Sequence, residues 1–124
     1  MVKYLVLILI LVDVALNVTG QLSLKYGMSK FGNFSLSAAT LPPIFLKAAT
    51  NVHILLGLLC YGLGFMVWLI VLAKAEVSYA YPLISLGYVF TAILARLLLG
   101  EAVTATRMAG ILVTCLGVFI IARS

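Results

Sequence analysis

The sequence predicts an all-α membrane protein with four transmembrane helices, built as a single domain over residues 1–124. Of its 124 residues, 65% are hydrophobic and only 9% are charged, and the mean hydropathy is +1.29. Soluble globular domains carry about 25% charged residues, so this composition indicates an integral membrane protein. The apolar residues form four long runs joined by short polar links, which is the pattern of helical spans.

The first apolar run predicts a helix from Tyr4 to Leu24, long enough to cross the ~30 Å hydrocarbon core of a bilayer. A more polar segment, Lys25–Asn51, follows it and contains the short apolar piece Ile44-Phe45-Leu46. Because that piece is too short to span a membrane, we expect an interfacial or re-entrant segment between the first two transmembrane helices.

Three further runs predict the helices Val52–Ala73, Ser78–Leu99 and Thr104–Ala122. The link Lys74–Val77 is very short, so the second and third helices must form an antiparallel hairpin. Pro82 lies in the first turns of the third helix, where it removes a backbone hydrogen bond and favours a kink.

The first helix carries a polar line inside its apolar run. Asp13, Asn17, Gln21 and Lys25 recur every fourth residue, and this spacing keeps side chains on one slowly drifting helical face. Asp13 lies roughly 15 Å along the helix from Lys3, so it is near the middle of a bilayer. A carboxylate at that depth costs several kcal/mol unless it is paired, protonated or hydrated, which makes it a candidate functional residue.

A second polar line follows the third helix in three- and four-residue steps. It consists of Ser78, Tyr81, Ser85, Tyr88 and Arg96. Two interpretations remain open. The line is either a set of interfacial tyrosines with interhelical hydrogen bonds, or one wall of a polar cavity opposite the first helix.

The second helix carries Gly57, Tyr61, Gly64 and Trp68 along one face, which favours either close packing with an interfacial tryptophan or an aromatic cavity lining. Glu101 follows the third helix. It either stabilises the N-terminus of the last helix through the helix dipole, or contacts the substrate or a salt-bridge partner.

The fourth helix presents the small residues Gly110, Thr114 and Gly117. Such a surface suits close helix contact, within one chain or between two chains. A four-helix chain of this size encloses little volume, so we expect a substrate path to need a second subunit.

Catalytic and metal-binding patterns are not visible in this sequence. It has no nucleophile–base arrangement, no metal-ligand spacing and no glycine-rich phosphate loop, so we expect neither an enzyme nor a cofactor. The net charge of +5 comes from basic residues scattered near helix ends, which is typical of headgroup contacts and argues against a nucleic-acid partner. Cys60 and Cys115 lie in apolar runs, and we interpret them as packing residues.

Several motifs resemble the small four-helix branch of the drug/metabolite transporter superfamily. Gly20-Gln21-Leu22-x-x-Lys25 resembles the signature at the end of that family's first helix, and Val77–Leu86 (VSYAYPLISL) is similar to its third-helix motif. Gly100–Thr104, with Gly110 and Gly117, resembles its closing pattern. The resemblance covers nearly the whole chain except residues 27–50. It implies a multi-pass transporter of the bacterial inner membrane that acts as a dimer.

Two subfamilies of this branch compete. The stretch from His53 to Ser85, with Gln21 and Lys25, looks most like the small subunits of the 4-amino-4-deoxyarabinose-phosphoundecaprenol flippase, which implies transport of a lipid-phosphate-linked sugar. Val12-Asp13-Val14 instead resembles the membrane-embedded Ala-Glu-Val of small multidrug resistance exporters, with Asp for Glu.

Our leading hypothesis is a flippase-like transporter that moves a polyprenyl-phosphate-linked sugar by alternating access of a homodimer or heterodimer. The anionic phosphate needs cations, which Lys25 and Arg96 could supply, and Asp13 would act as a coupling or counter-ion residue. The candidate substrate-binding residues are Asp13, Asn17, Gln21, Lys25, Tyr61, Trp68, Tyr81, Ser85, Tyr88, Arg96 and Glu101.

The alternative hypothesis is a proton-coupled exporter of small organic cations. Such a substrate needs a buried acid and aromatic walls, which Asp13 could supply with Tyr61, Trp68 and Tyr81. A third hypothesis is a non-transporting membrane subunit that scaffolds a partner.

Overall fold

The computed structural model describes residues 2–32 and 35–124, with side chains from Tyr4 onward. The described residues form α-helices and no β-strand. The helices are α1 (Val2–Ser29), α2 (Leu41–Ala48), α3 (Val52–Lys74), α4 (Val77–Ile84), α5 (Leu86–Leu99) and α6 (Ala105–Ala122). Four segments are long and apolar enough to cross a membrane, Tyr4–Ser29, Val52–Lys74, Val77–Leu99 and Ala105–Ala122. These findings confirm the predicted all-α fold with four spans.

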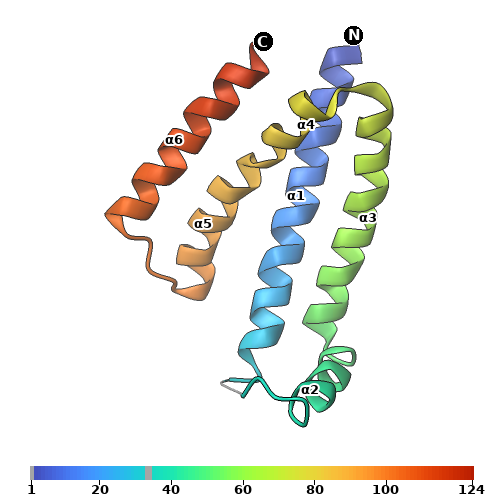
Figure 1. The fold of residues 1–124 in the computed structure, drawn as a ribbon, viewed down its shortest axis with the longest axis vertical. Helices are drawn as coiled ribbons and strands as arrows, with labels where there is room; N and C mark the ends of the chain where they lie inside the picture. Colours follow the sequence, from blue (N-terminus) through green and yellow to red (C-terminus); the bar gives the residue numbers. More distant parts are fainter. Residues whose placement is uncertain (1, 33–34) are drawn as a thin grey trace.

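The helix α1 lies at the centre of the arrangement. It runs antiparallel to α3 along most of its length and also contacts α4 and α5 (Figure 1). The helix α6 contacts α4 and α5, and its span is the least buried of the four. Both chain termini lie at the same end of the molecule, opposite α2 (Figure 1).

Glycines allow α1 and α3 to approach closely. A Cβ atom at Gly57 would lie 2.7 Å from Cγ of Leu24, and one at Gly20 would lie 3.2 Å from the Gly57 carbonyl oxygen. Helices in lipid gain stability mainly from such close backbone packing, because lipid tails are as apolar as the side chains that they replace. The α1–α3 pair therefore depends on the absence of side chains at this crossing.

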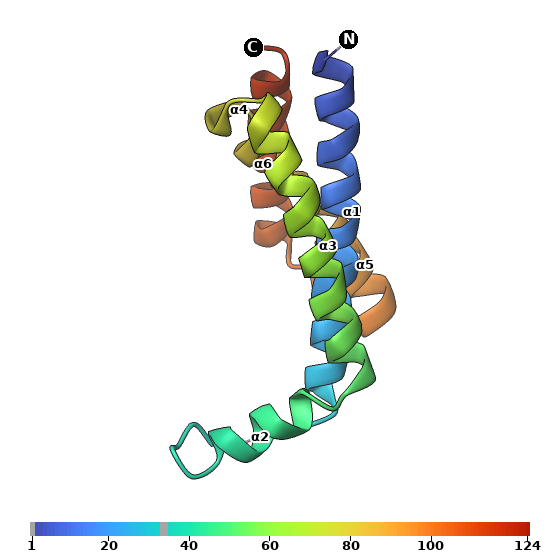
Figure 2. The same cartoon turned by 90° about the vertical axis from the view of Figure 1, so that its right-hand side faces the viewer.

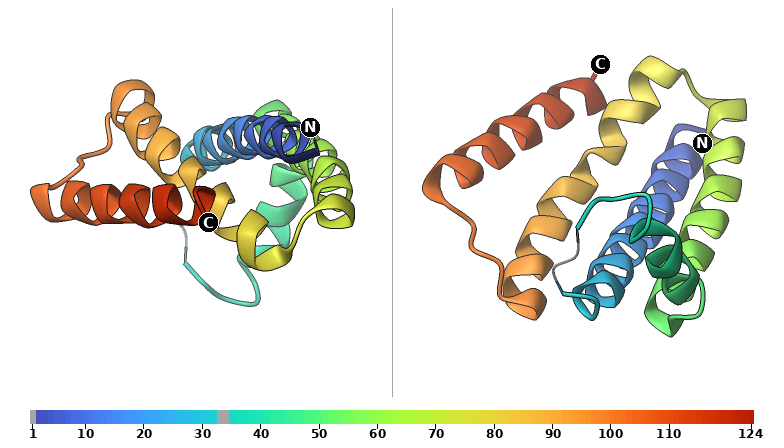
Figure 3. Two further views of the ribbon diagram at one scale, coloured as in Figure 1. Left: turned by 90° about the horizontal axis from the view of Figure 1, so that it is seen from above. Right: turned by 60° about the horizontal axis from the view of Figure 1, so that its bottom comes forward.

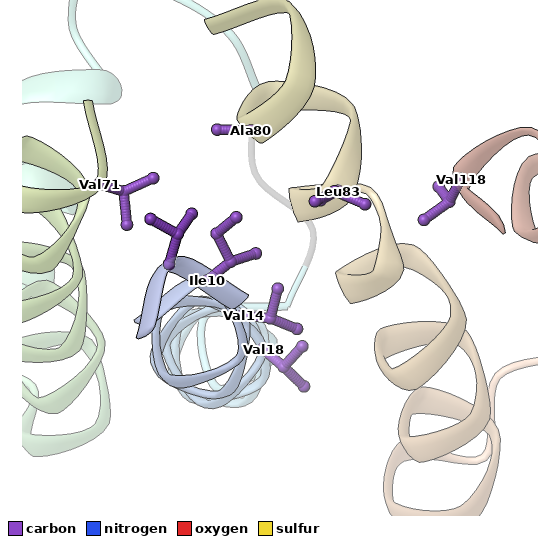
Figure 4. Packing of buried hydrophobic residues seen from close by; sticks show 8 residues of the cluster. Ile10, Val14, Val18, Val71, Ala80, Leu83 and Val118 are labelled. Atoms are coloured by element: carbon purple, nitrogen blue, oxygen red, sulfur yellow. The ribbon is translucent and has the colours of Figure 1, made fainter. Parts of the chain in front are cut away.

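The apolar core forms where α1 meets the other spans. Val6, Ile10, Val14 and Val18 recur every fourth residue along α1 and are all buried. They pack with residues of α3, α4 and α6 that are labelled in Figure 4, namely Val71, Ala80, Leu83 and Val118. Among the described residues of α6, only Val118 is buried in this core, and Ala122 packs against it while partly exposed.

The third span is broken at Ser85, between α4 and α5. Pro82 removes a helical backbone hydrogen bond, and the Ser85 side-chain hydroxyl donates to the Pro82 carbonyl oxygen. The Ser85 backbone N–H also donates to that oxygen at 3.0 Å. The Pro82 carbonyl at the break is thus satisfied locally, as a membrane interior requires. The kink that Pro82 predicts is present, and α4 and α5 run in different directions (Figure 1).

The end of the first helix differs from the sequence-based expectation. The helix α1 continues to Ser29 instead of ending near Leu24. Its end is tied to α3 because the rings of Tyr26 and His53 stack edge to face, with centroids 4.5 Å apart. The apolar piece around Phe45 belongs to α2, which projects sideways beyond the ends of α1 and α3 (Figure 2). It therefore lies outside the bundle of spans, and of the two forms expected for this segment the re-entrant one is excluded.

Substituting Gly57 with valine should destabilise the α1–α3 pair, because the new side chain would overlap Leu24. Overpacking of this kind costs about 1–3 kcal/mol. The matched control is Gly62→Val in the same helix, since a Cβ at Gly62 meets no atom within 4 Å. The free energy of unfolding, measured by SDS titration in bicelles, should fall for Gly57→Val only. Equal losses in both variants would contradict the close crossing.

Candidate functional site

A cavity of about 920 Å³ lies along one face of the molecule and is lined by residues of α1, α3, α4, α5 and α6. Seen from above, α6 stands apart from α1, while α1 and α3 lie side by side (Figure 3). Four spans therefore contribute walls to one space, and that space is the candidate functional site.

Nine of the eleven predicted site residues line this cavity. They are Asp13, Asn17, Gln21, Tyr61, Trp68, Tyr81, Ser85, Tyr88 and Glu101. The helix α1 supplies the first three at four-residue spacing, α3 supplies two aromatic residues, and the broken third span supplies three more. Asp13, Asn17 and Gln21 of the first polar line thus face the same space as Tyr81, Ser85 and Tyr88 of the second, as the cavity-wall interpretation expects, whereas Ser78 lies outside it.

Asp13 is the buried acid of the cavity, with 5% of its surface exposed. Its Oδ1 lies 2.8 Å from the position that a Cβ atom at Gly64 would occupy. Any larger residue at position 64 would push the carboxylate aside. Gly64 therefore acts as a positioning residue for Asp13, and the small-residue face of the second span has a role beyond helix packing.

Aromatic side chains form one wall of the cavity. The Trp68 and Tyr81 rings meet edge to face, with centroids 6.0 Å apart. The Gln21 side chain lies beside the Tyr61 hydroxyl, which places an amide next to a phenol on facing helices. Tyr81 and Tyr88 are each about two-thirds exposed and lack protein cover on their outer sides. Such a wall can stack on a sugar ring or face a cation.

Arg107 and Glu101 bring opposite charges to the same cavity, near the start of α6. Thr104 caps α6 by accepting the Arg107 backbone N–H at 3.1 Å, and the Arg107 guanidinium donates to the Ala102 carbonyl at 3.2 Å. The cavity is thus lined by two of the chain's three acidic residues and by one of its eight Lys and Arg residues.

Sequence reasoning did not include Arg107 among the candidate site residues. One available signal was its place in the first turn of a helix, where the positive end of the helix dipole disfavours a cation. Cys60, Phe65 and Thr91 also line the cavity without having been predicted.

Lys25 and Arg96 were predicted site residues, but neither lines the cavity, and both side chains are exposed elsewhere. The reason is helical geometry. Each four-residue step turns the side-chain direction by about 40°, so three steps carry Lys25 about 120° away from Asp13. Likewise, the eight residues from Tyr88 to Arg96 turn the direction by about 80°.

Comparison with known proteins places the chain in a family. The profile of the EamA-like transporter family matches residues 31–123. A probable 4-amino-4-deoxy-L-arabinose-phosphoundecaprenol flippase subunit ArnE from Pseudomonas savastanoi pv. phaseolicola is 32% identical over 84% of this chain and 85% of its own length. The ArnE subunit from Pseudomonas fluorescens is 30% identical over 94% and 96%.

A protein with the related name ArnF is similar as well. This probable flippase subunit from Photorhabdus laumondii is 32% identical over 91% of this chain and 93% of its own length. No solved structure matches. The family profile and these nearly full-length relatives confirm the resemblance to the drug/metabolite transporters, so this multi-pass membrane protein belongs to the EamA-like transporter family.

Proposed function

We propose that this chain is a subunit of a flippase-like transporter that carries a polyprenyl-phosphate-linked sugar across the bacterial inner membrane. The observation that supports this most strongly is the composition of the cavity, which combines Arg107, the buried Asp13 and an aromatic wall. A lipid-linked sugar phosphate offers a partner for each of these groups. The names of the similar proteins point to the same class of substrate.

The substrate that the relatives' names specify carries both an amine and a phosphate. In our proposal, the Arg107 guanidinium pairs with the phosphate, because a charge-assisted hydrogen bond to a phosphate oxygen is about twice as strong as a neutral one. Asp13 is the counter-ion of the sugar's ammonium group. Gln21 and the tyrosines bind the hydroxyl groups. This assignment explains why an acid and a base line one cavity, and it replaces Lys25 and Arg96 as the expected phosphate ligands.

The polyprenyl tail remains in the bilayer in this proposal. Because α6 is little buried, a second copy or a similar small subunit has room to cover the cavity from that side. Alternating access of the two subunits then exposes the polar head to each side of the membrane in turn. The flippase proteins similar to this chain are themselves named as subunits.

A second candidate function is proton-coupled export of small organic cations. The observation in its favour is that Asp13 and Glu101 outnumber Arg107 among the charged residues of the cavity. The two functions differ in what they require of Arg107. A cation exporter gains nothing from this residue, whereas a transporter of phosphate-linked sugars depends on it.

Replacing Arg107 with glutamine should lower the rate of lipid-linked sugar flipping in proteoliposomes by about ten- to a hundredfold, since hydrogen bonds to charged groups contribute about 1.5–3 kcal/mol. The matched control is Arg123→Gln, because Arg123 follows α6 at its other end, 5.7 Å from the Phe119 ring.

A normal rate in Arg107→Gln, combined with cation export that Asp13→Asn abolishes, would favour the exporter. Flipping by the purified protein alone would exclude a pure scaffold.

The Asp13→Asn variant tests whether Asp13 recognises the amine of the substrate and not its phosphate. Asparagine keeps the size of the side chain and removes its charge. We expect flipping of the amino-sugar lipid to fall at least tenfold, since a buried charge pair is broken. A lipid with a hydroxyl in place of the amine should be flipped by Asp13→Asn at least as fast as by the unmodified protein, because the carboxylate that repels its phosphate is removed. Equal losses of flipping rate with the two lipids would show that Asp13 does not recognise the amine.

The two cysteines test whether the cavity is open to water. Cys60 lines the cavity and Cys115 does not. A charged methanethiosulfonate reagent reacts with thiolates, which form only where water reaches the sulfur. The Cys115→Ser variant, which keeps Cys60, should be modified faster than Cys60→Ser, and bound lipid-linked sugar should slow the reaction. Equal modification rates in the two variants would contradict a hydrated cavity.

A further inference from the structure

The end of α1, the connection to α3 and the first residues of α3 carry lysines and no acidic residue. Residues 25–53 include Lys25, Lys30 and Lys47 and contain no aspartate or glutamate. All three lysine side chains are exposed. The Lys30 ammonium lies over the Tyr26 ring, 4.7 Å from its centroid, and so remains at this end of α1. None of the three lysines lines the cavity, so their charge is available to another partner.

The short helix α2 adds an apolar surface to this basic end. No residue of α2 is buried, and Phe45 and Leu46 are 67% and 72% exposed. By three- and four-residue spacing, Pro42 and Ala49 share the face of Phe45 and Leu46, whereas Lys47 projects from a different side. An apolar face next to a lysine is typical of helices that lie in a membrane interface.

The structure holds α2 in a defined direction. Asn51 caps α3 by accepting the backbone N–H groups of His53 at 2.9 Å and Ile54 at 3.3 Å, so the chain turns sharply between α2 and α3. A Cβ atom at Gly27 would lie 2.6 Å from Cγ1 of Ile54, which shows how closely the end of α1 meets this turn. As a result, α2 leaves the ends of the spans sideways (Figure 2).

We propose that α2 and the three lysines form an interfacial anchor that docks on the anionic phospholipids of the leaflet at this end of the protein. The exposed Phe45 and Leu46 enter the boundary between headgroups and acyl chains. The lysines contact the phosphates, and the absence of acidic residues over 25–53 makes the segment complementary to an anionic surface. This anchor is independent of what the cavity transports.

A single-tryptophan protein tests the depth of α2. The chain has one tryptophan, Trp68, so Phe45→Trp in a Trp68→Phe background places the only indole on α2. The protein is reconstituted into vesicles of phosphatidylcholine, with or without phosphatidylglycerol. We expect quenching by lipids brominated near the headgroup to exceed quenching by lipids brominated near the chain end, and to increase with phosphatidylglycerol. Solvent-like emission in both vesicles would overturn the proposal.

The lysines are tested in the same background with Lys25→Gln, Lys30→Gln and Lys47→Gln, singly and combined. Each loss should weaken the phosphatidylglycerol-dependent docking of α2 about fivefold, from the contribution of one lysine near an anionic surface. The matched control is Lys74→Gln, because Lys74 ends α3 at the end far from α2. This variant should leave the quenching unchanged. Unchanged quenching in the triple variant would overturn the role of the lysines.

Dilution of the protein in the vesicles distinguishes lipid from protein contacts. Docking on lipid predicts quenching by brominated lipid that does not change with the protein-to-lipid ratio. A blue-shifted indole that resists brominated lipid, and that becomes solvent-exposed on dilution, would mean that a second copy covers α2. That outcome would overturn the proposal of a lipid anchor.

Discussion

The close crossing of α1 and α3 is the contact on which the rest of the structure depends. Gly20 and Gly57 remove the side chains that would separate the two backbones, and Gly64 continues the same gap towards the middle of the membrane. Because the helices are so close, the Asp13 carboxylate lies directly against the Gly64 backbone. The glycines that allow α1 and α3 to pack closely also set the position of the buried acid. Packing and site geometry are therefore one constraint in this protein.

The free-energy cost of placing the cavity's polar residues in a bilayer is reduced because they face one shared space. A lone carboxylate at the membrane centre costs several kcal/mol, whereas polar groups that face a common cavity can be hydrated or paired with a ligand. Asn17 and Gln21 follow Asp13 along α1, and Ser85 faces the same space across the cavity. The break at Ser85 fits this arrangement, since the Pro82 carbonyl that it exposes is satisfied by Ser85 itself.

The sequence was sufficient to predict the four spans, the proline kink and nine of the residues that line the cavity, because these follow from apolar run length and helical periodicity. It was not sufficient to place Lys25 and Arg96, because a four-residue line drifts about 40° at each step and its far end leaves the face on which it began. Arg107 escaped prediction for a different reason. Its contact with the cavity depends on where α6 packs, and no periodicity within α6 encodes that.

Basic residues lie both inside and outside the cavity, and the two groups suit different anionic ligands. Lys25 and Arg96 lie outside the cavity, so a headgroup inside it has Arg107 as the single cationic ligand among the described lining residues. One cation beside two acids favours a headgroup that carries both charges over a simple phosphate, because a simple phosphate would be repelled by Asp13 and Glu101. Exposed lysines outside the cavity contact bulk lipid, which is abundant and needs no discrimination. In the proposed function, the cavity must distinguish one lipid from this background, and this requires few charges in fixed positions. The buried acid, which is the least expected residue in the first span, is thus the group best placed to provide that selectivity.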